Sequence, residues 1–154
     1  MKFVDLETVG YRHALLDGSF ARLRYVHSAW AHHIPTDLQR RLMATYRTEL
    51  AKGCPQAGED LAFGQALVAA CAAWLAALCS HLHRVADHDI RWGRASYRQR
   101  IATSLDHFIT VADEYRRMPA VRDAAADVER QLRNTWPSTE RQLATYPALA
   151  KGRT

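Results

Sequence analysis

The chain has 154 residues, of which 48% are hydrophobic and 24% charged, and its formal net charge at pH 7 is +5. This composition is that of an ordinary globular domain and excludes a chain that is disordered throughout. At this length we expect one domain, residues 1–154, that folds without a disulfide or a structural metal.

The location and the macromolecular partners are constrained by charge and by apolar patterning. Two acids, Asp5 and Glu7, stand where a secretory signal would have its apolar segment, and the cysteines are odd in number, so we expect a cytoplasmic protein. Residues 61–80 carry no charge and could span a membrane by length, but their alanine content favours a central buried helix and no membrane partner. The 18 arginines are scattered rather than clustered, so we expect no nucleic-acid partner.

The first predicted element is a short strand at Phe3–Leu6, where apolar and polar residues alternate. No second convincing strand follows in the sequence. A lone strand leaves its backbone groups unpaired, so we expect it to pair with another copy of the chain, as a homo-oligomer, or with a preceding lobe.

Helical signals dominate after Pro35. The sequence predicts a mainly α fold, in which the N-terminal strand is followed by a bundle of four or five helices. Their predicted positions are Thr36 to a stop at Gly53, about 57–86, about 95–118, about 119–136, and a short helix within 138–154.

The clearest amphipathic pattern lies in the third of these helices. Apolar residues recur there every three or four positions, and we expect them to be buried against residues 61–80. They are Tyr97, Ile101, Leu105, Phe108, Ala112 and Tyr115. We further expect the four tryptophans to anchor the core or the helix junctions: Trp30, Trp74, Trp92 and Trp136.

Residues 3–17 carry the most informative motif. Two apolar residues precede Asp5, an apolar residue and Glu7 follow it, Gly10 stands five residues after it, and Asp17 twelve residues after it. This pattern resembles the metal-binding strand and following loop of the kinase-like small-molecule phosphotransferases, the family that includes aminoglycoside and choline kinases. The resemblance implies that Asp5 binds Mg²⁺, that Glu7 assists it, and that Asp17 holds the loop. Without the resemblance, these acids are solvated side chains on an edge strand.

A weaker likeness covers most of the remaining chain. The segments at 89–100, 136–137 and 143–148 are similar to the C-terminal helical region of bacterial members of that family. The resemblance implies that the helices form the substrate-side subdomain, with a small molecule as substrate. The net basic charge of the chain disfavours polycationic aminoglycosides as that substrate.

Other parts of a phosphotransferase are missing from the sequence. It contains no Gly-x-Gly-x-x-Gly loop, no Walker-type lysine, no Val-Ala-Ile-Lys-like strand and no His-x-Asp catalytic loop. We therefore expect a nucleotide-binding lobe to precede Met1, and we expect no catalysis by this chain alone. Two alternatives stay open, a free-standing helical interaction protein and a helical metal site at Cys79 and His83.

Overall fold

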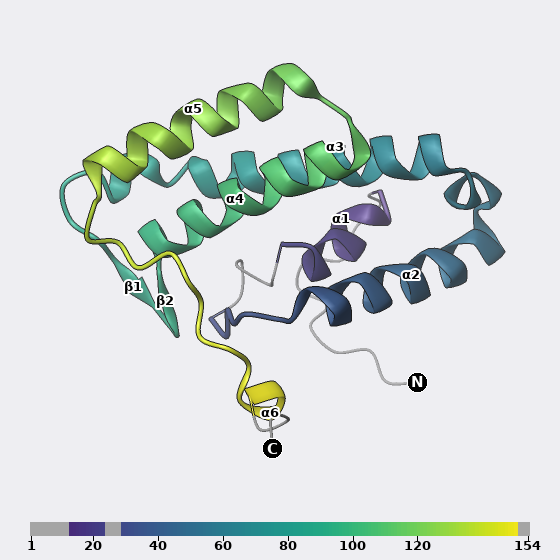
Figure 1. The fold of residues 1–154 in the computed structure, drawn as a ribbon, viewed down its shortest axis with the longest axis horizontal. Helices are drawn as coiled ribbons and strands as arrows, with labels where there is room; N and C mark the ends of the chain where they lie inside the picture. Colours follow the sequence, from purple (N-terminus) through teal and green to yellow (C-terminus); the bar gives the residue numbers. More distant parts are fainter. Residues whose placement is uncertain (1–12, 24–28, 151–154) are drawn as a thin grey trace.

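The mainly α fold is confirmed by the computed structural model, which describes residues 13–23 and 29–150 (Figure 1). The predicted strand at 3–6, with Asp5 and Glu7, lies outside the described residues. The four long helices are α2 (Thr36–Gly53), α3 (Asp60–Cys79), α4 (Tyr97–Tyr115) and α5 (Pro119–Thr135). The shorter elements are α1 (Leu15–Gly18), η1 (Ser19–Ala21), η2 (Pro55–Gly58), η3 (Leu82–Arg84), β1 (Arg91–Trp92), β2 (Ala95–Ser96) and α6 (Pro147–Ala150).

Helix α4 lies at the centre of the core and packs against both α3 and α5. Its predicted apolar stripe is confirmed, because Ile101, Leu105, Phe108 and Ala112 are all buried, while Tyr97 and Tyr115 are half-buried at its two ends. Local signals set its bounds. The Ser96 hydroxyl caps the helix by accepting from the Gln99 N–H, and Arg116 ends it in the left-handed conformation (φ 52°).

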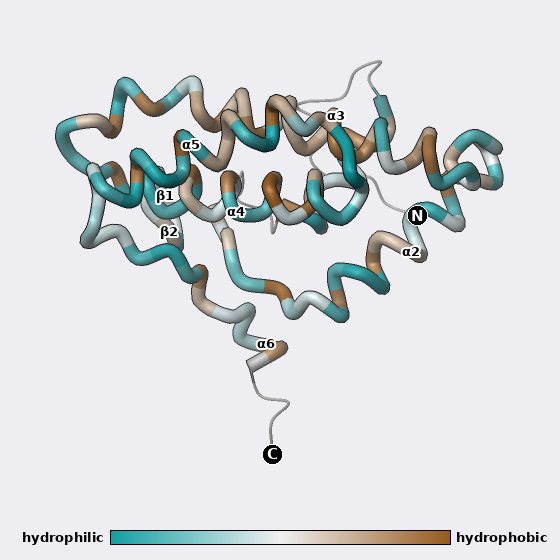
Figure 2. The backbone as a smooth tube through the Cα atoms, turned by 45° about the horizontal axis from the view of Figure 1, so that its top comes forward, coloured by the Kyte–Doolittle hydropathy of each residue, from teal (hydrophilic) through white to brown (hydrophobic). Residues whose placement is uncertain are grey.

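Helix α3 was expected to be the central buried helix, and this expectation is wrong in one respect. One face is buried, through residues such as Leu67, Cys71 and Leu75, whereas the opposite face is exposed. The exposed face carries mostly alanine. The two faces of α3 therefore differ in side-chain size but hardly in polarity. Figure 2 shows the result as apolar colours along much of α3, in contrast to the mixed colours of α2.

The same segment bears on the question of a membrane. Within the described residues, Asp60–Arg84 is the one stretch that is long and apolar enough to cross a bilayer by length and composition. In the fold, 44% of its most apolar window is buried.

A two-stranded antiparallel hairpin, β1 and β2, lies between α3 and α4, where the sequence predicts no strand. Gly93 turns it with a positive φ of 65°, and a side chain there would meet the Ala29 carbonyl. The fully buried Arg100 holds the hairpin by donating to the carbonyls of Trp92 and Ala95. Two residues per strand are too few for an alternating pattern to show in the sequence.

The tryptophans divide between the core and the surface. Trp136 is buried, and the half-buried Trp74 donates its indole N–H to the Leu16 carbonyl over 2.7 Å, as expected for anchors. Trp92 is 41% exposed but stacks on Tyr97, where the hairpin meets α4. The expectation is wrong for Trp30, which is 66% exposed because it lies in the loop before α2.

The central place of α4 can be tested by truncating Leu105, which is 2% exposed. We expect Leu105→Ala to lower the free energy of unfolding by about 2–5 kcal/mol, because it removes transfer free energy and leaves a cavity. Leu61→Ala is the matched control, because Leu61 is 64% exposed, and it should cost less than about 0.5 kcal/mol. Urea unfolding followed by circular dichroism measures both, and equal midpoint shifts would contradict the assignment.

Candidate functional site

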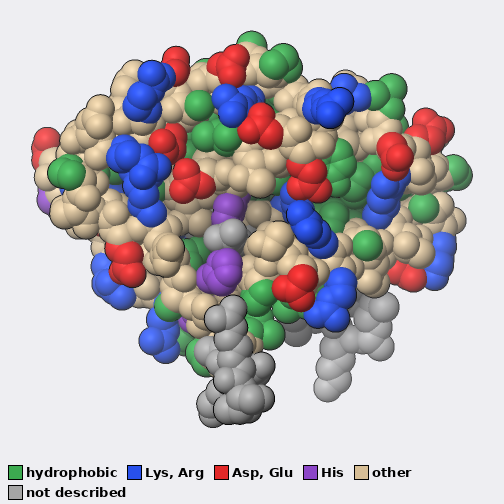
Figure 3. Space-filling model, in the orientation of Figure 1, with side chains coloured by type: hydrophobic (Ala, Val, Ile, Leu, Met, Phe, Trp, Pro, Cys, Tyr) green, Lys and Arg blue, Asp and Glu red, His purple; other side chains and the backbone are tan. Residues whose placement is uncertain are grey.

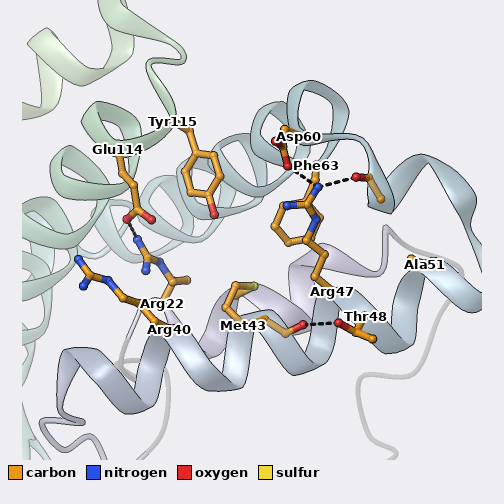
Figure 4. Close-up of a pocket in the computed structure, with 12 residues that line it drawn as sticks. Arg22, Arg40, Met43, Arg47, Thr48, Ala51, Asp60, Phe63, Glu114 and Tyr115 are labelled. Carbon is orange, nitrogen blue, oxygen red and sulfur yellow. Dashed lines mark hydrogen bonds and ion pairs between the residues drawn. The ribbon is translucent and has the colours of Figure 1, made fainter.

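A hollow of about 690 Å³ lies between α2, the start of α3 and the end of α4 (Figure 4). Three arginines, two carboxylates and two aromatic rings face it. They are Arg22, Arg40, Arg47, Asp60, Glu114, Phe63 and Tyr115. We call this hollow the arginine pocket.

One face of α2 forms a wall of the pocket. The residues of this wall are spaced one, three or four positions apart, which places them on one side of the helix. They are Arg40, Ala44, Arg47, Thr48 and Ala51. The other walls come from distant parts of the chain. Arg22 and Glu114, which face each other, are 92 residues apart.

Arg47 has a structural role. Its guanidinium pairs with Asp60 over 2.7 Å and donates to the carbonyls of Ala57 and Gly58, while it lies 4.7 Å from the centre of the Phe63 ring. These contacts tie α2 to the η2 turn and to the start of α3. The positive charge of Arg47 is therefore already matched by protein groups.

Arg22 is placed differently. Its side chain is only 6% exposed, and it pairs with Glu114, which is 40% exposed at the end of α4. Its Nε atom is buried and has no hydrogen-bond partner among the described residues. Leaving a buried donor unpaired is costly, so this guanidinium is under-satisfied by the protein.

Tyr115 supplies a neutral polar group. In Figure 4 its hydroxyl points into the space between Arg22 and Phe63. Burial raises the pKa of this hydroxyl, the Glu114 carboxylate raises it further, and Arg22 and Arg47 act in the opposite direction. Tyr115 therefore stays protonated at neutral pH and can donate a hydrogen bond into the pocket.

Outside the pocket, charges of both signs are mixed over the surface. Figure 3 shows Lys and Arg side chains next to Asp and Glu side chains across the visible face. Ion pairs lie within α5 and beside it, such as Arg130 with Asp127 and Arg122 with Asp113. Pairs this exposed contribute little to stability.

Of the three acids to which the resemblance assigns a role, only Asp17 lies within the described residues. Asp5 and Glu7 lie outside the described residues, and Asp17 is exposed in α1. Asp17 acts on Tyr46, whose pKa is raised by burial and by the Asp17 charge, and the Tyr46 hydroxyl donates to the Ala14 carbonyl. Among the described residues, no cluster of three or more His, Cys, Asp or Glu side chains is arranged to hold a metal.

Comparison of the chain with protein-family models, with curated proteins and with solved structures finds no match. No family is therefore shown for this chain, the likeness to phosphotransferases stays an expectation from the motifs, and the pocket is described from its geometry.

Sequence reasoning did not find the arginine pocket. The spacing of Arg40 and Arg47 is visible in the sequence, but two arginines seven residues apart on an amphipathic helix are common on surfaces. Nothing local marks Arg22 or Glu114, because their pairing depends on the docking of α4 onto the segment after α1.

The wall of the pocket can be tested at Gly64. A Cβ atom there would stand 2.6 Å from Cδ1 of Tyr115, so Gly64→Ala must displace the ring. We expect a loss of about 1–3 kcal/mol in the free energy of unfolding, because overpacking outweighs the helix preference of alanine. Gly58→Ala is the control, because Gly58 lines the pocket with open space at the Cβ position, and this variant should be nearly neutral. Equal stability of both variants in urea melts would show that the ring does not pack against α3.

Proposed function

We propose that this chain is the substrate-side, helical portion of a kinase-like small-molecule phosphotransferase and does not transfer phosphate by itself. The observation that carries the proposal is the spacing of Asp5, Glu7, Gly10 and Asp17, directly before a helical domain. The mainly α architecture of residues 29–150 supports it, since the resemblance implies helices after the motif. The cytoplasmic location stays a prediction.

The chemistry assigned to the motif is metal binding. Asp5 and Glu7 would hold Mg²⁺, which prefers carboxylate oxygens and supplies charge neutralisation to a transferring phosphoryl group. Two carboxylates bind this ion weakly without substrate phosphates to complete its shell. The proposal therefore assigns these residues a supporting share of a larger active site.

The metal assignment is tested with Mn²⁺ as a paramagnetic probe in the full chain. We expect Mn²⁺ to broaden the amide NMR signals of residues 3–8 at lower concentrations than those beside Asp37 and Asp127, two exposed acids elsewhere. Asp5→Asn should abolish the preference, and Asp37→Asn should leave it intact. Broadening that spreads evenly over the surface acids would refute the assignment.

Inactivity is tested separately. Without the phosphate-covering loop, the strand lysine and the catalytic base, we expect no heat on titration with Mg-ATP. We also expect no ADP release in the presence of aminoglycosides, choline or sugars, because loss of a general base alone costs about 10²–10⁴ in rate. Turnover that disappears in Asp5→Ala would contradict the predicted inactivity and would confirm the role of Asp5.

A second candidate function, a helical interaction protein that pairs with another copy of itself, is favoured by one surface. Trp30, Tyr146 and Leu149 are exposed around an apolar groove of about 380 Å³. Exposed apolar patches of this kind promote association. Multi-angle light scattering should then report a dimer that Trp30→Arg converts to a monomer, whereas a monomeric wild-type chain at micromolar concentration would exclude this function.

A further inference from the structure

The arginine pocket adjoins a smaller hollow of about 80 Å³. Arg22, Arg40 and Glu114 line both hollows, so the Arg22–Glu114 pair stands between them. The smaller hollow adds the hydroxyl-bearing side chains Thr36 and Thr110. Its volume exceeds the roughly 10–15 Å³ that a cavity needs to admit one water, so a small polar group fits inside it.

The charges at this boundary do not cancel. Arg22 forms an ion pair with one carboxylate, that of Glu114, and the buried Nε atom of Arg22 has no hydrogen-bond partner among the described residues. Arg40 lies on α2 beside it, and no described residue forms an ion pair with Arg40. Two guanidinium groups, the buried Arg22 and the exposed Arg40, therefore lie beside one carboxylate, Glu114, and the charge of Arg40 is balanced by no described residue.

Arg47, in the same pocket, is an arginine whose charge and hydrogen-bond donors are matched by protein groups. Its contacts with Asp60, two backbone carbonyls and the Phe63 ring account for its charge and its hydrogen bonds. Arg22 and Arg40 lack such a set. Guanidinium groups bind carboxylates and phosphates strongly through charge-assisted, often bidentate hydrogen bonds.

We propose that the boundary between the two hollows is a binding site for a small oxyanion, the carboxylate or phosphate group of a soluble ligand. The oxyanion lies between Arg22 and Arg40 and receives hydrogen bonds from Thr36. The remainder of the ligand occupies the arginine pocket against Met43, Phe63 and the protonated Tyr115 hydroxyl. Glu114 sets the affinity by competing for Arg22.

This site stands on the pocket geometry alone and does not depend on the phosphotransferase assignment. The Mn²⁺ experiment above probes residues 3–8, whereas the oxyanion experiment probes α2 and α4. Either proposal can therefore fail while the other holds.

The test is isothermal titration calorimetry of the full chain with inorganic phosphate and with malonate, at fixed ionic strength. We expect Arg40→Gln to weaken binding at least about tenfold, the loss of one charge-assisted hydrogen bond. Arg41→Gln is the matched control, because it removes the same charge from the next residue of α2. The Arg41 side chain is 74% exposed and does not line either hollow, so the Arg41→Gln variant should bind both anions as tightly as the wild-type chain.

A second variant tests the role of Glu114. Glu114→Gln removes the competing carboxylate, and we expect it to tighten oxyanion binding by at least about threefold. Tighter binding of phosphate than of malonate would identify a phosphorylated ligand, and the reverse order a carboxylic acid. Absence of binding by both anions, or equal weakening in Arg40→Gln and Arg41→Gln, would overturn the proposal.

Discussion

The burial of α4 is the constraint on which the rest of the structure depends. Every residue from Gln99 to Leu105 is buried, and three of the polar side chains in this stretch find partners inside the fold. Gln99 and Thr103 donate to the carbonyls of Gln142 and Arg141, which holds the C-terminal segment over α4. Arg100 holds the hairpin in the same way. The surrounding segments therefore pack around α4 by satisfying its polar groups as well as by apolar contact.

The long helices could be predicted because their signals are local. Pro35 and Gly53 bound α2, and the spacing of Ile101, Leu105 and Phe108 defined the buried face of α4. The central place of α4 could not be predicted, because polar residues such as Arg100 mask its burial, whereas the alanines of α3 suggest more burial than that helix has. The exposure of Trp30 depends on the path of the loop before α2, for which the sequence carries no signal.

The site divides in the same way. The motif from Asp5 to Asp17 could be found in the sequence because its residues are close together, and the roles of these residues are those that the resemblance implies. The arginine pocket could not be predicted, because Arg22, Arg40 and Glu114 come from three parts of the chain, the residue after η1, α2 and the end of α4, that meet only in the folded structure. Among its arginines, geometry separates Arg47, which ties elements together, from Arg22 and Arg40, whose charge is incompletely matched. This distinction is the basis of the proposed oxyanion site.

Hydrogen–deuterium exchange tests the buried central helix and the proposed oxyanion site at its C-terminal end in one measurement. We expect the slowest exchange at residues 101–112, with or without anion. We also expect saturating phosphate or malonate to slow exchange at residues 22–23, 36–44 and 110–115 and to leave the hairpin at 91–96 unchanged. Faster exchange in α4 than in α2, or anion protection outside the pocket, would contradict the account.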